Sequence, residues 1–263
     1  MTKKASVGIS ISSLGHTFPG GVTALTDFSL EIEPGEFVSI VGPSGCGKTT
    51  VLNLVAGLHD VQTGAIKVGS SGPKAGRHDV AYMMARDCLY PWLTAQQNAE
   101  FGNMIRKTDK AKTTTRALEL LERAGLKGFE GALPKELSHG MRQRVALART
   151  FAMPSPVLLM DEPFGALDAQ TKLVLAELLD QLWEQEHRTV LFITHDLAEA
   201  IALSDRVIVM SQRPGRIIAN IKIDLERPRS VRALQKDPHF HEIYANVWSL
   251  LEQALEDKPA EVV

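Results

Sequence analysis

A single glycine-rich run constrains the fold of this chain more than any other feature of its sequence. Residues 42–50 read GPSGCGKTT, follow the apolar run 37–41 and precede apolar residues at helical spacing between Val51 and Leu58. A strand that leads through such glycines into a helix is typical of a phosphate-binding loop in an α/β fold. We therefore expect a sheet whose strand 37–41 ends at a site for phosphate groups.

The residue types of this loop suit that chemistry. Glycines let successive backbone N–H groups turn toward a bound phosphate, and the N-terminus of the next helix adds its positive dipole. We expect Lys48 to lie against the β and γ phosphates and the Thr49 hydroxyl to bind Mg²⁺. A glycine-rich turn with a solvated lysine is the alternative, and the flanking strand and helix count against it. The predicted nucleotide contacts in this loop are Gly42, Pro43, Ser44, Gly45, Cys46, Gly47, Lys48, Thr49 and Thr50.

The pattern of apolar residues predicts the fold class. Residues 157–160 and 190–193 are near-continuous apolar runs, as expected of parallel strands that are buried on both faces. Residues 28–32 instead alternate apolar with polar side chains, which indicates a half-buried strand. Segments with helical spacing separate these runs. The chain is thus predicted to be an α/β protein with a mostly parallel sheet and helices on both faces.

Two segments differ from this alternation of strand and helix. Residues of about 92–153 have helical spacing and predict a helical insertion, within which a helix is expected from Met141 to Met153 after the N-cap Ser138. Residues 224–263 contain a candidate amphipathic helix at 240–255 and a charged tail. We therefore predict one domain over residues 1–223 and a C-terminal accessory helical segment over 224–263.

Composition excludes several classes of function. With 29 Lys and Arg against 31 Asp and Glu, the formal net charge is −2, so no broad basic face for nucleic acid is expected. No apolar run approaches the roughly 20 residues that span a bilayer. The two cysteines, Cys46 and Cys88, form neither a disulfide framework nor a metal-binding pattern, which favours a reducing, cytoplasmic setting.

A pair of acidic residues follows the apolar run 157–160. Asp161 and Glu162 would lie at the carboxyl edge of the sheet, where ligands bind in such folds. We expect Asp161 to serve as the Mg²⁺ carboxylate with Thr49, and Glu162 to polarise the water that attacks the γ phosphate. Adjacent acids at a strand end are often only solvated, but the glycine loop favours the catalytic interpretation.

Residues 137–144, LSHGMRQR, resemble the signature motif of the ATPase subunits of ABC transporters. The resemblance covers nearly the whole chain, because residues 165–168 match the D-loop and residues 194–196 match the segment of the switch histidine. It implies a P-loop NTPase core with an antiparallel β subdomain and a helical insertion. It also implies hydrolysis of ATP with Mg²⁺ as cofactor.

The resemblance assigns further site residues. Phe18 would stack on adenine, and His195 would join Lys48 and Glu162 as a catalytic residue. Ser138, Gly140 and Asp168 would contact the nucleotide held by a second copy of the chain, so that two chains enclose two ATP molecules head to tail. The expected partner is therefore another copy of this chain.

Two positions depart from the family pattern. Ala85 stands where a glutamine usually binds Mg²⁺, and His139 stands where the signature usually has glycine. Alanine offers no side-chain oxygen, so we expect the ligand to come from water or from a neighbour such as Asp87. The hypothesis is that this chain hydrolyses ATP with weakened ordering of Mg²⁺.

An ATPase without a membrane span needs a separate permease for transport. The expected docking segment is 86–103, with Leu89, Tyr90, Trp92 and Leu93 as candidates to line a groove, although each could equally pack inside the helical insertion. Part of the sequence resembles one branch of this family, the ATPase subunits of nitrate, sulfonate and taurine importers. The resemblance lies in residues 91–94 with Asn98 and in residues 212–217. The resemblance implies a peripheral subunit at the cytoplasmic face of the inner membrane, linked indirectly to an extracytoplasmic solute-binding protein.

Two other functions stay open at this point. One is a non-transport soluble ABC ATPase, for which the long coiled-coil insertion or second cassette expected in DNA repair or translation would not fit in 263 residues. The other is a regulatory nucleotide-binding subunit, against which Glu162 argues, because loss of that base is the usual way to disable hydrolysis. A GTPase or kinase would share the loop 42–50 but would not need the motif at 137–144.

Overall fold

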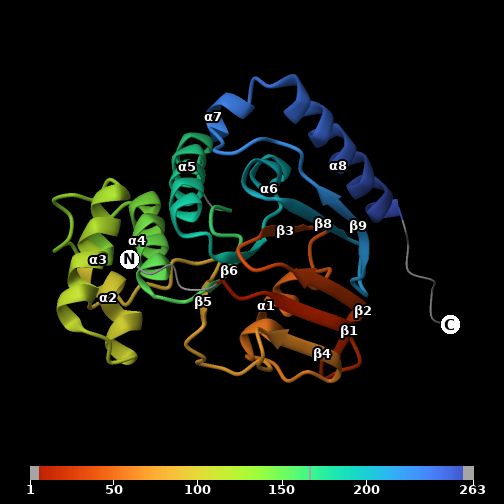
Figure 1. Ribbon diagram of the computed structural model, residues 1–263, viewed down its shortest axis with the longest axis horizontal. Helices are drawn as coiled ribbons and strands as arrows, with labels where there is room; N and C mark the ends of the chain where they lie inside the picture. The colour runs from red at the N-terminus through yellow and green to blue at the C-terminus, as the bar shows by residue number, and fades with distance from the viewer. Residues whose placement is uncertain (1–5, 166, 257–263) are drawn as a thin grey trace.

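The computed structural model describes residues 6–165 and 167–256, which form two β-sheets surrounded by helices (Figure 1). The larger sheet has the strand order β5-β6-β7-β3-β8-β9, parallel from β5 to β8 with β9 antiparallel to β8. The prediction of an α/β fold with a mostly parallel sheet is confirmed. Its strands are β3 (Phe37–Val41), β5 (Val80–Met83), β6 (Val157–Asp161), β7 (Thr189–Ile193), β8 (Arg206–Met210) and β9 (Ile217–Lys222).

The smaller sheet is antiparallel, in the order β2-β1-β4. It consists of β1 (Ile9–Thr17), β2 (Thr23–Ile32) and β4 (Thr63–Val68). In β2 the apolar side chains Phe28, Leu30 and Ile32 are buried, whereas the polar residues between them are exposed, as their alternation predicts. This sheet is the antiparallel β subdomain that the resemblance implied.

The strands of the larger sheet divide their side chains between two hydrophobic cores. In β3, Val38 and Ile40 join a core formed with β1, β2 and helix α1 (Lys48–Ala56), whereas Phe37 and Val41 join a second core on the other face. A period of two explains why both faces of these strands need apolar residues. The near-continuous apolar runs of the sequence follow from this double burial.

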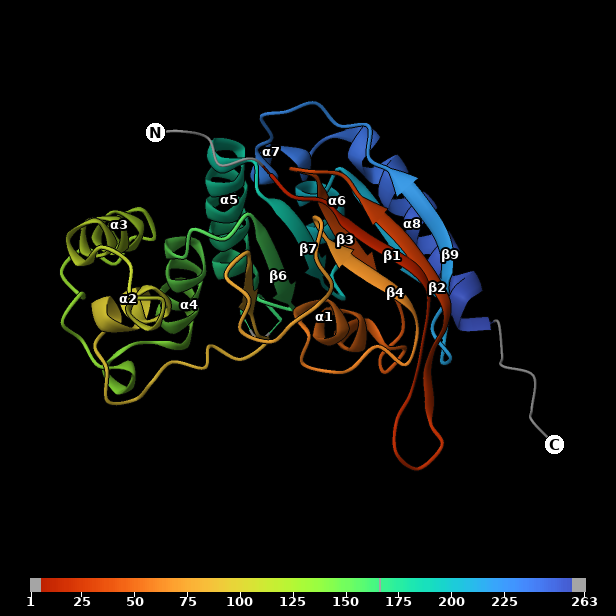
Figure 2. The ribbon, with the colours of Figure 1, turned by 60° about the horizontal axis from the view of Figure 1, so that its bottom comes forward.

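The second core contains most of the remaining helices. Helices α2 (Ala95–Ile105), α3 (Lys110–Arg123) and α4 (His139–Ala152), with the 3₁₀ turn Pro134–Glu136, lie together at one end of the molecule (Figures 1 and 2). Helices α5 (Ala169–Glu186) and α6 (Leu197–Leu203) cover the sheet between them and the C-terminal segment. The predicted helical content of residues 92–153 is thus confirmed, and the proposed boundary of the insertion stays a prediction.

One helix starts earlier than expected. Helix α4 was predicted from Met141 to Met153, but it begins at His139 and ends at Ala152. The reason is the cap: the Ser138 hydroxyl accepts a hydrogen bond from the backbone N–H of Met141 at 3.2 Å, so helical geometry begins directly after Ser138. Gly140 therefore lies inside the first turn of α4.

The C-terminal segment packs along the far edge of the larger sheet. It contains α7 (Val231–Leu234) and α8 (Pro238–Glu256), and α8 lies against α6, β8 and β9 (Figures 1 and 2). Phe240, Val247 and Ala254 of α8 are buried, whereas Trp248 is half exposed. The predicted amphipathic helix is confirmed, and residues 257–263 of the predicted accessory segment lie outside the described residues. Within the described ranges, no helix is long and apolar enough to cross a membrane.

Candidate nucleotide site

The glycine loop joins β3 to α1 and leaves the start of that helix open. Gly45 and Gly47 have positive φ angles of 75° and 107°, which glycine adopts without the strain that a Cβ would cause. Gly47 is the N-cap of α1, and no side chain of the described residues caps this helix. Its first-turn N–H groups are therefore available to an anion, in addition to the favourable end of the helix dipole.

Lys48 folds back over the same loop. Its Nζ atom donates hydrogen bonds to the carbonyl oxygens of Gly42 at 2.8 Å and Pro43 at 2.9 Å. A third, longer contact of 3.9 Å runs from Nζ to the sulfur of Cys46, so all three donors of the ammonium group point into the loop. Cys46 is buried within the loop, and this burial raises the pKa of its thiol. The loop is thus a preformed cradle for phosphate oxygens.

Thr49 and Asp161 meet at the carboxyl edge of the sheet. Thr49 follows the loop in α1, Asp161 ends β6, and the Thr49 hydroxyl donates a hydrogen bond to the Asp161 carboxylate at 3.2 Å. Burial raises the pKa of Asp161, and the neighbouring Glu162 charge adds to this rise, although the Thr49 hydrogen bond and the Lys48 charge act against it. A cation would compensate the charge of this carboxylate.

These two oxygen ligands fit Mg²⁺. Magnesium keeps several waters and binds proteins through one or two carboxylates together with substrate phosphates. Within the described ranges, no group of three or more His, Cys, Asp or Glu side chains is arranged to hold a metal. Thr49 and Asp161 are the residues that would hold the ion.

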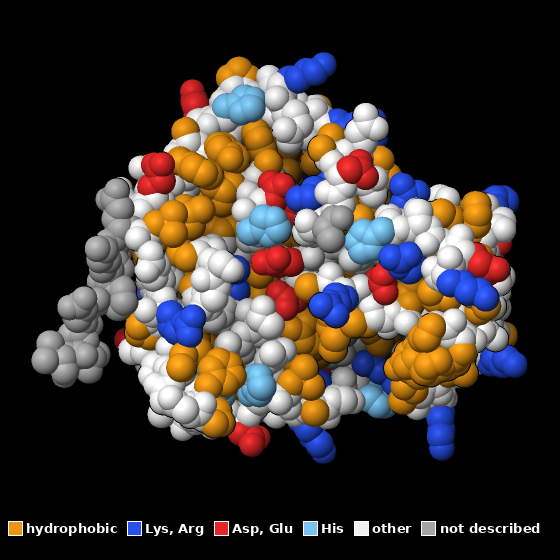
Figure 3. All heavy atoms as spheres, turned by 180° about the vertical axis from the view of Figure 1, so that it is seen from behind, with side chains coloured by type: hydrophobic (Ala, Val, Ile, Leu, Met, Phe, Trp, Pro, Cys, Tyr) orange, Lys and Arg blue, Asp and Glu red, His pale blue; other side chains and the backbone are white. Residues whose placement is uncertain are grey.

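Glu162 and His195 form a second pair beside the first. Glu162 follows β6 with a φ of 44°, an unusual conformation for a residue with a Cβ, and its backbone N–H donates to the Ile193 carbonyl at 2.9 Å. This bond ties the turn after β6 to the end of β7. As a result, the Glu162 Oε2 atom lies 3.2 Å from Nδ1 of His195. Figure 3 shows acidic and histidine side chains gathered near the centre of this face.

A hollow of about 330 Å³ collects the predicted residues of the phosphate site. It brings Phe18 of the smaller sheet's β1–β2 turn against the loop, and a T-shaped contact with His16, with ring centroids 4.9 Å apart, supports the Phe18 ring. Gly42, Pro43 and Cys46 belong to the loop without lining the hollow. Its lining residues are Phe18, Val22, Ala24, Ser44, Gly45, Gly47, Lys48, Thr49, Thr50, Glu162 and Arg213.

Three further predicted nucleotide contacts lie outside both the hollow and the glycine loop. Ser138 and Gly140 are at the start of α4, and Asp168 is the N-cap of α5. The two helix starts adjoin, since a Cβ on Gly140 would come within 2.9 Å of Thr171 Cγ2. Asp168 accepts hydrogen bonds from the Thr171 hydroxyl at 2.6 Å and from the N–H groups of Gln170 and Thr171. Ala166, within the segment that matches the D-loop, lies outside the described residues.

The segment around Ala85 is attached to α4 and not to the glycine loop. Ala85 is exposed, and the Asp87 carboxylate forms an ion pair with Arg142 at 2.9 Å. Arg149 donates to the carbonyl oxygens of Asp87 at 2.6 Å and of Cys88 at 2.7 Å. Asp87, expected as a substitute metal ligand, is therefore engaged by a guanidinium in this conformation.

His139 takes part in the same attachment. Its Nδ1 atom lies 3.3 Å from Nη2 of Arg142, so the ring and the Asp87 carboxylate share one guanidinium. The Nε2 atom of His139 is buried without a hydrogen-bond partner among the described residues. The unusual histidine of the signature is thus linked through Arg142 to the segment that carries the unusual alanine.

Sequence reasoning missed two residues of this region. Asn98 is fully buried, and its side-chain oxygen accepts a hydrogen bond from the Tyr90 N–H at 2.8 Å. Its side-chain NH₂ group donates to the carbonyl oxygens of Tyr90, Leu93 and Thr94. These bonds fix the turn that contains Trp92. Arg213 lines the hollow although it is more than 160 residues from the loop. The available signal for Arg213 is the run RPG at 213–215, which the sequence alone relates only to the branch of nitrate, sulfonate and taurine importers.

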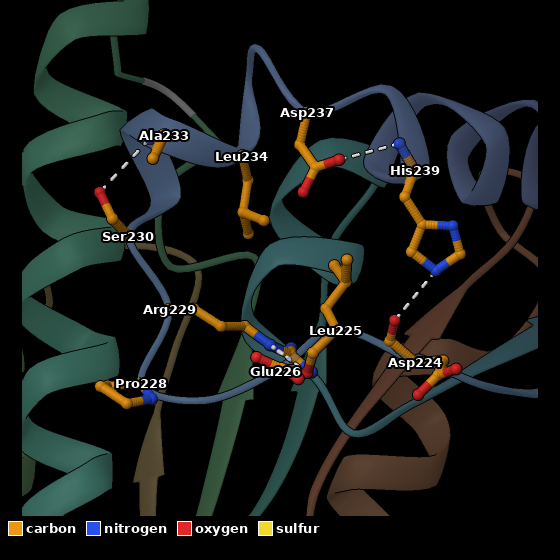
Figure 4. A pocket seen from close by; sticks show the side chains of 10 residues that line it. All are labelled: Asp224, Leu225, Glu226, Pro228, Arg229, Ser230, Ala233, Leu234, Asp237 and His239. Carbon is orange, nitrogen blue, oxygen red and sulfur yellow. Dashed lines mark hydrogen bonds between the residues drawn. The ribbon is translucent and has the colours of Figure 1, made fainter.

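A second hollow, of about 360 Å³, lies in the C-terminal segment (Figure 4). Its polar groups are already paired: Arg229 donates to the Leu225 carbonyl at 3.0 Å, and His239 Nε2 lies 3.0 Å from the Asp224 carbonyl. Asp237 accepts from the His239 N–H at 2.8 Å. These bonds order residues 224–239 internally. Arg229 also donates to the Ser204 carbonyl after α6 at 2.8 Å, and the Arg232 N–H donates to Glu177 of α5 at 3.1 Å, so the bonds around this hollow fix the position of the segment.

Comparisons with known proteins identify the family of this chain. A family model described as "ABC transporter" matches residues 25–165. An uncharacterized ABC transporter ATP-binding protein of Methanocaldococcus jannaschii is 44% identical over 81% of this chain and 80% of its own. A nitrate import ATP-binding protein of Synechocystis is 41% identical over 92% and 94% of the two chains, and a taurine import ATP-binding protein of Roseobacter denitrificans is 38% identical over 95% and 98%.

A solved structure gives the same result for the fold. A dimeric ATP-binding cassette in a post-hydrolysis state, bound to ADP and Pi, superposes with a TM-score of 0.73 at 31% identity, over 83% of this chain and all of that one. The glycine loop, the paired acids and the capped signature helix thus occur together in a chain that matches this family along most of its length. The protein belongs to the ABC transporter family, as an ATP-binding subunit with ATPase activity.

Proposed function

We propose that this chain energises the uptake of a small anion such as nitrate, sulfonate or taurine through a separate permease. The observation that carries the proposal is the division of the site: the groups for phosphate binding and water attack line or adjoin one hollow, whereas Ser138, Gly140 and Asp168 lie outside it. Such a division suits two copies that complete each other's sites. The nitrate and taurine import relatives support the transport assignment.

The chemistry proceeds through the residues of this hollow. Glu162 orients a water molecule and accepts its proton as the water oxygen bonds to the γ phosphorus. The bond from that phosphorus to the bridging oxygen breaks, which leaves ADP and inorganic phosphate. The Nδ1 atom of His195 lies 3.2 Å from Oε2 of Glu162. His195 would donate a hydrogen bond to this carboxylate and so help to position it. Lys48 offsets negative charge over the loop, and Mg²⁺ held by Thr49 and Asp161 would neutralise more of it.

A second copy of the chain supplies what the hollow lacks. The starts of α4 and α5 adjoin, so Ser138, Gly140 and Asp168 form one surface. The start of α4, with Ser138 and Gly140, suits the γ phosphate of the partner's nucleotide, and Asp168 would contribute to the contact between the two copies. The dimeric cassette bound to ADP and Pi supports this arrangement. ATP then acts as a bridge between the copies, and its hydrolysis lets them separate.

The permease would dock on the insertion. Trp92 is 71% exposed next to the turn that Asn98 orders, and Met104 and Ile105 are exposed on α2. Figure 3 shows hydrophobic side chains gathered at the surface on the side of the molecule that holds these helices. This docking would place the chain peripherally at the cytoplasmic face of the membrane, with an extracytoplasmic solute-binding protein as an indirect partner.

The Glu162→Gln variant tests the enzymatic part of the proposal. The amide keeps the shape of the side chain but cannot accept the proton, so we expect ATP-bound pairs of chains in light scattering and loss of hydrolysis. Glu242→Gln, an exposed change on α8, is the matched control and leaves turnover unchanged. Unchanged turnover in Glu162→Gln would overturn the assignment of the base.

A second experiment tests the transport part. The chain is reconstituted with the permease and solute-binding protein of its transport system, and ATP-dependent uptake of labelled nitrate, taurine and a larger sulfonate is compared. We expect one of these anions to raise ATPase activity and to accumulate. Robust ATPase activity that responds to no solute and supports no uptake would contradict the transport function while leaving the nucleotide site intact.

A further inference from the structure

We propose that Arg213 is an additional nucleotide-binding residue of this chain, whose guanidinium contacts the phosphates of the nucleotide held in the glycine loop of the same chain. This inference rests on the proposed function, because it extends the same nucleotide site. Arg213 lines the hollow together with Lys48 and Thr49, and its Nη2 atom would lie 3.3 Å from a Cβ placed on Gly45. The guanidinium therefore lies directly over the loop.

The fold holds the segment of Arg213 against the loop. Strand β8 runs beside β3 with Val209 opposite Val41, so the chain leaves β8 where β3 enters the glycine loop. The Gly215 N–H donates to the Ala24 carbonyl at 2.8 Å, and the Gly215 carbonyl accepts from the Thr26 N–H at 3.2 Å. These bonds attach residues 211–216 to the smaller sheet.

A close backbone contact attaches the same segment to the glycine loop itself. A Cβ on Gly215 would come within 2.1 Å of the Cys46 carbonyl oxygen, so only glycine permits this approach. The Ser211 hydroxyl also accepts a hydrogen bond from the Arg216 N–H at 3.0 Å, which closes the turn. The position of Arg213 is thus set by contacts on both of its sides.

The charge of Arg213 is free to meet a ligand. Its side chain is exposed and makes no hydrogen bond or ion pair with the part of the chain that the structure describes. Lys48, the other cation of the hollow, already donates to two loop carbonyls. An arginine binds phosphate oxygens in a two-pronged geometry, and charge-assisted bonds of this kind are among the strongest hydrogen bonds.

The test measures equilibrium binding of ADP to the full chain, since ADP neither turns over nor bridges two copies. We expect Arg213→Met to weaken ADP binding about tenfold, as loss of a charge-assisted bond implies. The slope of log Kd against log salt should become shallower, because one cationic contact is missing. Arg213→Lys, which keeps the charge, should restore most of the affinity. Arg232→Met, an exposed change on α7, is the matched control and leaves ADP binding unchanged.

Three results would overturn the inference. Affinity for ADP in Arg213→Met within twofold of the unmodified chain would show that the guanidinium makes no phosphate contact. An equal loss in Arg213→Lys with an unchanged salt slope would indicate a purely structural role. A third result would be unchanged ADP binding in Arg213→Met, together with loss of the ATP-bound pairs when Arg213→Met is combined with Glu162→Gln. It would show that Arg213 contacts the nucleotide of the partner chain and not that of its own chain. Failure of the unmodified chain to bind any nucleotide would instead contradict the proposed function itself.

Discussion

Three helix N-termini belong to the proposed phosphate sites, and the start of α1 differs from the starts of α4 and α5 in how it is capped. Helix α1 has Gly47 at its N-cap and no side-chain cap, so its first N–H groups have no partner from the described residues. Helices α4 and α5 are capped by the side chains of Ser138 and Asp168. The first site is open and needs a ligand, whereas the second surface is already satisfied within its own chain.

The two regions also hold carboxylates with opposite properties. Burial raises the pKa of Asp161 beside α1, whereas the hydrogen bond from the Thr171 hydroxyl lowers the pKa of Asp168 at the start of α5. A raised pKa means that the folded chain disfavours the charge, and a lowered pKa means that it stabilises the charge. The chain alone thus disfavours the charge of Asp161, whereas it stabilises the charge of Asp168.

The largest expected effect comes from removing the cation of the open site. Lys48→Ala should lower ATP turnover by about 10²–10³-fold, because one preorganised group that offsets developing charge is lost. Lys222→Ala, an exposed change at the end of β9, should leave turnover unchanged. Steady-state phosphate release measures both variants. Turnover in Lys48→Ala within threefold of normal would mean that the open site is not where the chemistry occurs.

The next prediction separates the two roles of Ser138. Asp caps a helix as well as Ser does, so Ser138→Asp should keep the unfolding free energy, whereas Ser138→Ala should lower it by about 1 kcal/mol. The carboxylate would meet the partner's γ phosphate, so Ser138→Asp should reduce turnover more than tenfold. Denaturant unfolding without nucleotide and ATP turnover check the two halves. Normal turnover in Ser138→Asp would contradict the contact across the pair.

A third prediction concerns the segment of Ala85, which is attached to α4. Ala85→Gln should supply a side-chain oxygen, and we expect the Mg²⁺ concentration for half-maximal hydrolysis to fall several-fold. Asp87→Asn serves as the comparison, since it weakens the ion pair with Arg142 without adding a ligand near the loop. Titration of ATPase activity with Mg²⁺ measures both variants. Identical Mg²⁺ dependence in Ala85→Gln and the unmodified chain would count against the hypothesis of weakened ordering.

Local sequence patterns predicted the open site well because its parts are short and adjacent. Residues 37–50 indicate a strand, a loop and the start of a helix within fourteen residues. The alternation of apolar and polar residues in 28–32 indicates which face of the strand formed there is buried. The place of Glu162 followed from one strand end. These features depend on backbone geometry and periodicity, which a single sequence displays directly.

The remaining contacts depend on tertiary packing, which local patterns do not display. Arg213 reaches the hollow only because β8 lies beside β3, and the pairing of Asp87 with Arg142 depends on how α4 packs against the segment of Ala85. The sequence correctly indicates Ser138 as the N-cap of α4, but the first helical residue is His139 and not Met141 as predicted. Long-range neighbours of this kind carry no periodic signal.

The smallest predicted effect tests the contrast between the two aspartates through pH. The folded pKa of Asp161 lies above its ordinary value near 3.8. Between these two pKa values the folded chain binds more protons than the unfolded chain, so the free energy of unfolding falls as pH rises through the folded pKa. Asp161→Asn should remove that loss.

For Asp168 the sign is reversed: its contribution is present above about pH 3.8 and is lost as pH falls through the lowered folded pKa. Asp168→Asn should therefore be less stable than the unmodified chain at neutral pH, and the difference should shrink toward pH 3. Unfolding free energies without nucleotide or Mg²⁺ between pH 3 and 7 measure both variants. Parallel pH profiles for the two variants would contradict the distinction between an open site and a surface satisfied within its own chain.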